Sequence, residues 1–266
     1  MLPIGDVNPT RHTPYLTLAL IALNAAAFLF WQPTFAGSEE RQQVFFYCNA
    51  EVPFEVSHQT SLAEGGAGAR AAIEDEFGPG SGAPIQQLLT ERCPGKSWLA
   101  SVFASMFLHA GWAHIGFNML FLWVFGNNVE DRLRPIAFAI FYLLGGIAAT
   151  ALQVAFDPGS AVPNIGASGA VAAVLGAYLV MFPRARVRTL SLFFIVTVLE
   201  LPALVFLGLW FVLQLFSGVG ELGSNVNAGV AYWAHIGGFL AGVAGGLLFR
   251  SRHGEGGWAP PRPDLF

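Results

Sequence analysis

Five polar side chains interrupt long apolar stretches of this sequence: His109, His114, Asn118, Ser168 and His235. Such residues are costly where the surrounding stretch lies in lipid, so their default interpretation is functional. A serine hydroxyl is a weak nucleophile that becomes reactive when an adjacent base takes its proton, and histidine is a common base. Imidazole and amide N–H groups can donate hydrogen bonds to a developing oxyanion. The five residues can therefore support acyl transfer if the fold brings them together.

The composition places the surrounding elements in a membrane. Hydrophobic residues make up 54% of the 266 residues and charged residues only 11%, with a mean hydropathy of +0.55. A soluble domain usually carries about 25% charged residues, so this chain has too few to cover a water-facing surface. The net charge of −4, without a basic cluster that includes aromatic residues, gives no reason to expect nucleic acid as a partner.

Six apolar stretches are expected to cross the membrane, because a hydrocarbon core of about 30 Å needs roughly 20 helical residues. The second is long, since its first part, Leu99 to Leu108, can form a separate interfacial piece. The fourth is short and rich in alanine and glycine, as expected of a central helix shielded by the others. We predict an all-α membrane protein, a six-transmembrane helical bundle with a short central fourth helix. The predicted spans are Tyr15–Trp31, Leu99–Phe125, Ile136–Phe156, Ser168–Phe182, Leu201–Phe216 and Tyr232–Phe249.

The arginines predict how the chain is oriented, because cytoplasmic loops near span ends carry an excess of positive charge. With six crossings, the segments before span one, between spans two and three, after span four and after span six all lie on one side. Both termini are therefore expected to be cytoplasmic, with the protein in the cell membrane of a bacterium. The arginines in these segments are Arg11, Arg132, Arg134, Arg184, Arg186, Arg188, Arg250, Arg252 and Arg262.

The sequence divides into four parts under this topology. Residues 1–35 hold the N-terminus and the first span, residues 36–97 form a polar insert outside, residues 98–250 hold spans two to six, and residues 251–266 form a tail expected to be disordered. A cleavable signal peptide ending near Ala36 is the alternative for the first stretch, although that stretch is longer than a usual signal core. Both cysteines, Cys48 and Cys93, fall in the insert, where an oxidising compartment permits a disulfide; two unrelated thiols are the alternative.

The topology gives the five polar residues a common depth. Spans two, four and six all run from outside to inside, and in each the polar residues lie within the first turns after the external end. Small residues spaced by four allow membrane helices to approach closely, as a contact between serine and histidine requires. Such stripes are Ser168, Ala172 and Gly176 in the fourth span, and Ala234, Gly238, Gly242 and Gly246 in the sixth.

At this point the sequence resembles the rhomboid family of intramembrane serine proteases. The resemblance extends over Leu99 to Phe249 and implies a bundle of rhomboid type, with residues 98–250 as its catalytic core. The order and spacing of the motifs together are specific, although each alone is short. The motifs are His109-Ala-Gly-Trp-Ala-His114-Ile-Gly-Phe-Asn118, Glu130-Asp131-Arg132, Gly166-Ala167-Ser168-Gly169 and Ala234-His235-Ile-Gly-Gly238-Phe-Leu-Ala-Gly242.

The resemblance implies a role for each matching residue. Ser168 is the expected nucleophile and His235 its general base, a dyad without a third carboxylate. His114 and Asn118 are the expected oxyanion donors, helped by the backbone N–H of Ser168. The remaining matches are expected to be structural: His109, Gly166, Gly169, Gly238 and Gly242 around the site, and the pair Glu130 and Arg132 in the loop after the second span.

The sequence departs from the family pattern beside the catalytic histidine. Some members carry an aromatic residue four positions after the nucleophile, where this chain has Ala172. Another group must then hold His235, and the nearby candidates are Tyr232, Trp233 and Phe239. The resemblance places a lateral gate in the fifth span, at Trp210, Phe211 and Gln214.

The implied activity is cleavage of transmembrane segments of other proteins near the external membrane face. The expected partners are transmembrane substrates and the lipid bilayer, with no cofactor and no metal. A catalytically inactive rhomboid-like protein that binds membrane clients is one alternative, but such proteins typically lack the serine or the histidine. A proton-coupled transporter is another, yet the polar residues cluster near one surface instead of forming a path across. A metal site is discounted, because His109 and His114 lack an acidic or cysteine partner.

Overall fold

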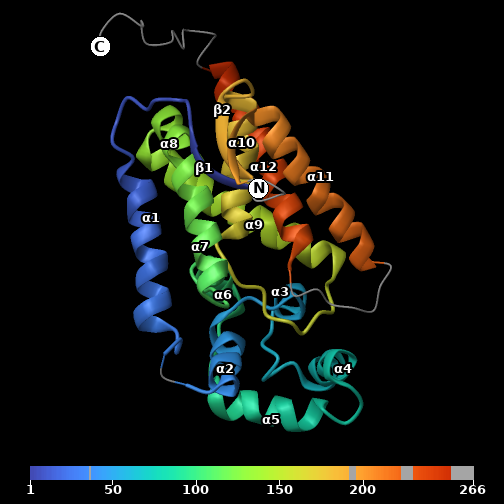
Figure 1. Ribbon diagram of the computed structural model, residues 1–266. Helices are drawn as coiled ribbons and strands as arrows, with labels where there is room; N and C mark the ends of the chain where they lie inside the picture. Colours follow the sequence, from blue (N-terminus) through green and yellow to red (C-terminus); the bar gives the residue numbers. More distant parts are fainter. Residues whose placement is uncertain (36, 192–195, 223–229, 253–266) are drawn as a thin grey trace, which may run out of the picture.

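The computed structural model describes residues 1–35, 37–191, 196–222 and 230–252, and it is mostly helical (Figure 1). Long helices run side by side in a bundle, and four short helices lie together at one end of it. The bundle contains α1 (Tyr15–Ala26) with its continuation η1 (Ala27–Trp31), α6 (Trp98–Ser105), α7 (Trp112–Phe121), η2 (Leu122–Gly126), α8 (Asn127–Leu133), α9 (Pro135–Phe156), α10 (Ser168–Met181), α11 (Ala203–Leu222) and α12 (Tyr232–Arg252).

Three helices in the described residues are long and apolar enough to cross a membrane: Pro135–Phe156, Ala203–Gly220 and Tyr232–Arg250. Two shorter apolar helical stretches, Tyr15–Trp31 and Ser168–Met181, accompany them. The predicted second span is not one helix, because α6 ends at Ser105 and α7 begins at Trp112. Its first part is thus a separate piece, while the count of six crossings remains a prediction.

Helix α10 is the buried centre of the bundle. Every residue from Gly169 to Tyr178 is buried, and the helix has only 14 residues. It packs against α12 backbone to backbone: a Cβ atom on Gly238 would lie 2.0 Å from the carbonyl oxygen of Gly169, and one on Gly242 would lie 2.0 Å from that of Ala173. Glycine at these positions lets the two helix axes approach, as small residues do between membrane helices.

On α10 the contact uses the predicted stripe and also the row beside it. A Cβ atom on Gly176, from the stripe, would lie 2.1 Å from the carbonyl oxygen of Phe239. Gly238 and Gly242 contact the backbone of the neighbouring row, at Gly169 and Ala173. Successive residues on a helix are rotated by about 100°, so this register leaves Ser168 beside the contact instead of inside it. The serine side chain therefore borders the cavity described below.

A three-stranded antiparallel sheet corrects the all-α prediction. Its strands are β1 (Leu2–Asp6), β2 (Arg186–Ser191) and β3 (Thr197–Pro202), in the order β1-β2-β3. Side chains along β2 alternate between exposed and buried, which is the period of a strand, and the exposed ones include two of the arginines used to orient the chain. The sheet also moves the start of the predicted fifth span, because Leu201 pairs with Val187 in the sheet and α11 begins at Ala203. The helix then continues past the predicted end at Phe216, to Leu222.

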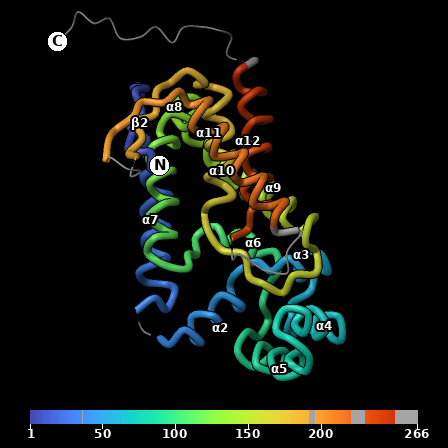
Figure 2. The backbone as a smooth tube through the Cα atoms, turned by 45° about the vertical axis from the view of Figure 1, so that its right-hand side comes forward, coloured from blue at the N-terminus to red at the C-terminus, as the bar shows by residue number. Residues whose placement is uncertain are grey.

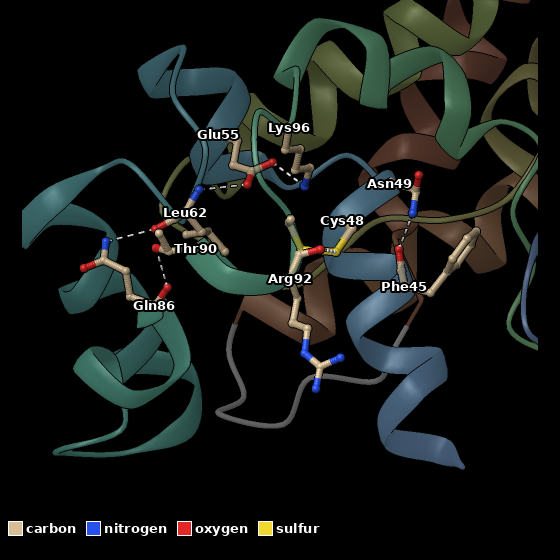
Figure 3. Close-up of a disulfide and its surroundings, with 10 residues drawn as sticks. Phe45, Cys48, Asn49, Glu55, Leu62, Gln86, Thr90, Arg92 and Lys96 are labelled. Atoms are coloured by element: carbon tan, nitrogen blue, oxygen red, sulfur yellow. Dashed lines mark hydrogen bonds and ion pairs between the residues drawn. A yellow bond between two sulfur atoms is a disulfide. The ribbon is translucent and has the colours of Figure 1, made fainter. Parts of the chain in front are cut away.

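The insert forms a small helical unit with a core of its own. It contains α2 (Glu39–Asn49), α3 (Pro53–His58), α4 (Gly66–Phe77) and α5 (Gly82–Arg92), and it lies at the end of the bundle opposite β2 (Figures 1 and 2). Phe54, Leu62 and Ile73 are among the buried residues of its core. In the structure a disulfide joins Cys48 at the end of α2 to Cys93 just after α5 (Figure 3). Closing a loop with a sequence separation of 45 contributes about 4 kcal/mol in the chain-entropy account.

A buried ion pair lies within the insert, between α3 and the segment after α5. Lys96 and Glu55 form an ion pair, with 2.6 Å between Nζ and Oε2, and both side chains are almost fully buried (Figure 3). Desolvation by burial raises the pKa of Glu55 and lowers that of Lys96, although each group favours the charged form of the other. Removing one partner would leave an uncompensated buried charge and would destabilise the fold of the insert.

Glu51 makes the stability of the folded insert depend on pH. Burial raises the pKa of its carboxyl to about 7, above the 4.5 of an exposed glutamate, although Asn164 donates a hydrogen bond to it. Because the folded state holds the proton more tightly, its stability falls as pH rises from about 4.5 to about 7, by up to ~3 kcal/mol at 1.36 kcal/mol per pKa unit. Glu51→Gln keeps an acceptor for Asn164 and removes the charge.

We therefore expect the Glu51→Gln variant to unfold at a higher temperature than wild type at pH 8 and at a similar temperature at pH 4.5. Thermal unfolding followed by circular dichroism at both pH values measures this difference. Glu64→Gln is the matched control, because it makes the same change at an exposed glutamate of the insert. Equal unfolding temperatures of wild type and Glu51→Gln at pH 8 would contradict the assignment.

We predicted a disordered tail at residues 251–266. Residues 253–266 of this tail lie outside the described residues. Helix α12 itself continues to Arg252. The proposed boundaries of the four parts of the chain remain predictions.

Candidate active site

A cavity of about 420 Å³ collects four of the five polar residues singled out in the sequence. Ser168, His235, His114 and Asn118 all line it, at the end of the bundle that faces the insert. All four side chains come from the first two turns of their helices, so they lie at the same end of the bundle. The other lining residues are mostly apolar: Ala110, Phe117, Phe121, Ile165, Val171, Ala172, Leu175, Trp210, Val230 and Ala231.

Ser168 is the first residue of α10, and the glycine two positions before it shapes its surroundings. Gly166 has a φ of +125°, in the region that side chains rarely adopt. A Cβ atom at this position would lie 2.8 Å from Nε2 of His114 and 3.4 Å from Oγ of Ser168. Both functional atoms therefore lie close to one backbone position, and only glycine leaves the space between them open.

His114 presents one ring nitrogen to this space. Its Nδ1 accepts a hydrogen bond from the backbone N–H of Ala110, at 3.3 Å. An accepting Nδ1 carries no proton in the neutral ring, so the proton is on Nε2, the atom near Gly166. Asn118, one turn later, donates one amide hydrogen to the carbonyl of His114 at 3.0 Å and keeps a second for another acceptor. Both side chains can thus act as donors in the cavity.

His235 is held from α11. Its Nδ1 lies 2.8 Å from Oε1 of Gln214, and the indole of Trp210 lies against its ring with 6.1 Å between centroids at 36°. Among the described residues no hydrogen bond joins His235 to Oγ of Ser168. Catalytic hydrogen bonds often tighten only when substrate binds, so the shared cavity is the relevant observation.

Among the described residues, the printed partners of the His235 ring are Gln214 and Trp210, which the resemblance had assigned to the gate. Of the three candidates that we named for holding His235, Trp233 stacks on Phe156 with 3.6 Å between ring centroids. Phe239 packs against Phe211 and Trp210, so it supports the indole that lies near the imidazole.

His109 lies outside the cavity and is fully buried. Its ring contacts that of His114 edge to face, with 5.0 Å between centroids. The side chain of Gln32 bonds both the N–H and the carbonyl of the His109 backbone, at 3.1 and 2.8 Å. This environment agrees with a structural role. Gln32 was not among the residues predicted for the site.

Glu130 stabilises the start of α1 instead of pairing with Arg132. Its carboxylate accepts hydrogen bonds from the backbone N–H of Leu16 and Thr17 and from the hydroxyl of Thr17, at 2.7 to 2.9 Å. Among the described residues it forms no ion pair with Arg132. A carboxylate at these N–H groups favours the helix start, because the first turn leaves them without partners in the helix.

The segment before Ser168 is fixed by the insert and by α6. The backbone N–H of Asn164 donates to the carbonyl of Glu51 at 2.7 Å, and its side chain donates to the Glu51 carboxylate at 2.9 Å. The carbonyl of Ser105 accepts from the N–H of Gly166 at 2.9 Å, while the Ser105 hydroxyl accepts from the N–H of Glu51 at 2.6 Å. Ser168 therefore follows a segment that hydrogen bonds join to Glu51 and to Ser105.

Comparison with known proteins agrees with the motifs. A family model described as Rhomboid domain matches residues 96–252. The chain is 34% identical over 143 residues to Rhomboid protease GluP of Bacillus subtilis, covering 53% of this chain and 25% of that protein. It is 29% identical over 148 residues to Rhomboid protein 1, mitochondrial, of Saccharomyces cerevisiae, covering 54% and 40%.

Over 153 residues it is 32% identical to Rhomboid-related protein 2 of Mus musculus, covering 57% of this chain and 49% of that protein. The chain thus spans less than half the length of each of these three relatives. They come from a bacterium, a yeast mitochondrion and a mouse, so they do not by themselves assign a compartment. Since the matched domain covers more than half of its residues, this chain belongs to the rhomboid family of integral membrane proteins.

Proposed function

We propose that this protein is an intramembrane serine endopeptidase that cleaves transmembrane segments of other membrane proteins. The observation that carries the proposal is that one cavity contains Ser168, His235, His114 and Asn118. Each of these residue types has a distinct task in acyl transfer, and each comes from a position that matches the family motifs. The presence of both serine and histidine in the cavity argues against an inactive protein that only binds clients.

In the proposed mechanism the hydroxyl of Ser168 attacks the carbonyl carbon of a substrate peptide bond while Nε2 of His235 takes its proton. The oxyanion that forms accepts hydrogen bonds from Nε2–H of His114, from the free amide hydrogen of Asn118 and from the backbone N–H of Ser168. The imidazolium then gives its proton to the leaving amine, and an acyl-enzyme remains. A water molecule, deprotonated by His235, hydrolyses the ester and restores the serine.

The membrane arrangement is part of the same proposal. The chain crosses six times, with both termini in the cytoplasm and the insert outside, and cleavage occurs near the external face. In support, the cavity residues lie at the insert end of the bundle, while the arginine-bearing β2 lies at the opposite end (Figure 2). Water reaches a site near the surface more easily than one at the midplane. The reaction as written uses only side chains of this chain and water.

Covalent labelling tests the proposal without knowledge of a natural substrate. A serine-directed fluorophosphonate is expected to modify Ser168 of the purified full chain, and to modify His235→Ala at a rate lower by about 10²-fold or more, because the general base is lost. His58→Ala is the matched control: it removes an exposed histidine of α3 that lies outside the cavity and should leave the labelling rate unchanged.

The label is located by mass spectrometry of the digested protein. Modification at a different residue would contradict the assignment of the nucleophile. An unchanged labelling rate in His235→Ala would contradict the assignment of the base.

A further inference from the structure

Gln214 stands out as a polar residue in the interior of the apolar helix α11, and its carbonyl oxygen is the atom 2.8 Å from Nδ1 of His235. We propose that Gln214 is a positioning residue for the catalytic histidine. Its side-chain oxygen accepts a hydrogen bond from Nδ1–H, so that the lone pair of Nε2 is the one available to take the proton of Ser168. This inference rests on the proposed function, because it adds Gln214 as a third residue to the dyad of Ser168 and His235.

The chemistry of imidazole makes the direction of this hydrogen bond decisive. The neutral ring has one proton, and the nitrogen without it is the base. An acceptor at Nδ1 keeps the proton there and leaves Nε2 free. A donor at Nδ1 would have the opposite effect, because it would place the ring proton on Nε2 and remove the base. Gln214 presents its acceptor atom, Oε1, and therefore selects the productive form.

The same hydrogen bond persists through the reaction. When Nε2 receives the proton of Ser168, the ring becomes an imidazolium in which both nitrogens carry a proton, and Oε1 of Gln214 continues to accept from Nδ1. Hydrogen bonds to charged donors are stronger than those between neutral groups. The amide itself neither gains nor loses a proton, so it orients the ring without joining the proton transfer.

A second side chain of α11 fixes the plane of the same ring. Trp210 and Gln214 are four residues apart and therefore lie on one face of the helix. The indole of Trp210 lies beside the imidazole, with 6.1 Å between centroids and 36° between the planes, while Gln214 bonds its Nδ1. Trp210 is in turn supported by Phe239, at 5.9 Å between centroids. Trp210 and Gln214 thus hold the ring of His235. The neighbouring position on α10 is Ala172, whose side chain is only a methyl group.

Two variants separate the hydrogen bond from packing. Gln214→Met keeps the length of the side chain and removes the strong acceptor, whereas Gln214→Glu keeps an acceptor oxygen in the same place. Leu213→Ala is the control, because Leu213 is exposed on α11 and does not line the cavity. We expect kcat for a transmembrane substrate to fall about 10-fold or more in Gln214→Met with little change in KM, and to stay within a few-fold of wild type in the other two variants.

The tautomer of His235 is read separately, from ¹⁵N spectra of protein labelled at histidine and assigned with His235→Gln. The Nδ1–H form is expected in wild type and in Gln214→Glu, and a shift toward Nε2–H in Gln214→Met. Equal kcat and equal tautomer in wild type and Gln214→Met would overturn the role of Gln214. Faster cleavage by Gln214→Met would also overturn it, because that result is expected of a residue that acts in the lateral gate.

The spectra keep this inference distinct from the proposed function. A wild-type protein that cleaves no transmembrane substrate would overturn the protease assignment. An Nε2–H tautomer in wild type would overturn the role of Gln214 whatever the activity.

Discussion

Ser168→Ala is expected to lower the rate of cleavage of a transmembrane substrate by about 10⁴-fold or more, to below detection. Alanine has no nucleophile, so no acyl-enzyme can form, and the remaining oxyanion donors have nothing covalent to stabilise. The loss should be in kcat. Purified protein in liposomes, incubated with a substrate that carries one transmembrane segment, gives the rate from the appearance of the product on a gel.

The variant should remain folded, since the methyl group of alanine fits wherever the serine side chain fits. Its helical circular dichroism and unfolding temperature should equal those of wild type. Ser57→Ala is the matched control and should keep full activity, because Ser57 lies in α3, outside the cavity. Cleavage by Ser168→Ala at the wild-type rate would show that the proposed nucleophile is wrong.

The second large effect is on stability. Gly242→Ala adds one methyl group to the contact between α10 and α12, where its carbon would lie 2.0 Å from the carbonyl oxygen and 2.7 Å from the Cα of Ala173. Both obstacles are backbone atoms, so no side-chain rotation relieves the overlap and the helices must separate. We expect a loss of about 2–3 kcal/mol in the free energy of unfolding, at the upper end of the range for overpacked cores. Activity should fall as well, because the same two helices carry Ser168 and His235.

Gly208→Ala provides the comparison for this substitution. It is the same change inside α11, where an added methyl group meets nothing within 4 Å, and it should be neutral or stabilise by up to about 1 kcal/mol through helix propensity. Unfolding in a denaturing detergent, followed by circular dichroism, compares the two variants with wild type. If Gly242→Ala and Gly208→Ala unfold at the same midpoint, the close contact of α10 and α12 does not exist.

Local sequence was enough to predict the helical character and the family, which the domain match confirms. The four residues of the cavity were also selected correctly as neighbours. They could be found because a polar residue in an apolar stretch is conspicuous. In addition, the predicted direction of each span indicates which of its residues lie near the same end of the bundle. The sheet was missed because β1 pairs with β2 across more than half of the chain. Pairing over such a distance leaves no periodic signal near Leu2–Asp6.

The partner of His235 was missed for a different reason. Gln214 and Trp210 were named in the fifth span only because the family resemblance places a lateral gate there. Only coordinates show which face of α11 meets α12. Glu51 carried no signal, because it is one of many acids in a polar insert, and its burial depends on Asn164 and Ser105 in distant parts of the chain.

The link between Glu51 and Asn164 has a consequence for the order in which the protein is made. The two residues are 113 positions apart, so at about 5–20 residues per second Asn164 is synthesised about 6–23 s after Glu51. Until then the Glu51 carboxylate lacks the amide of Asn164 as its partner, and the segment that precedes Ser168 has not been completed. His235 is synthesised later still, as part of α12, the helix whose glycines pack closely against α10. A nascent chain therefore completes the contacts of its insert only when it has also made the segment that leads into Ser168.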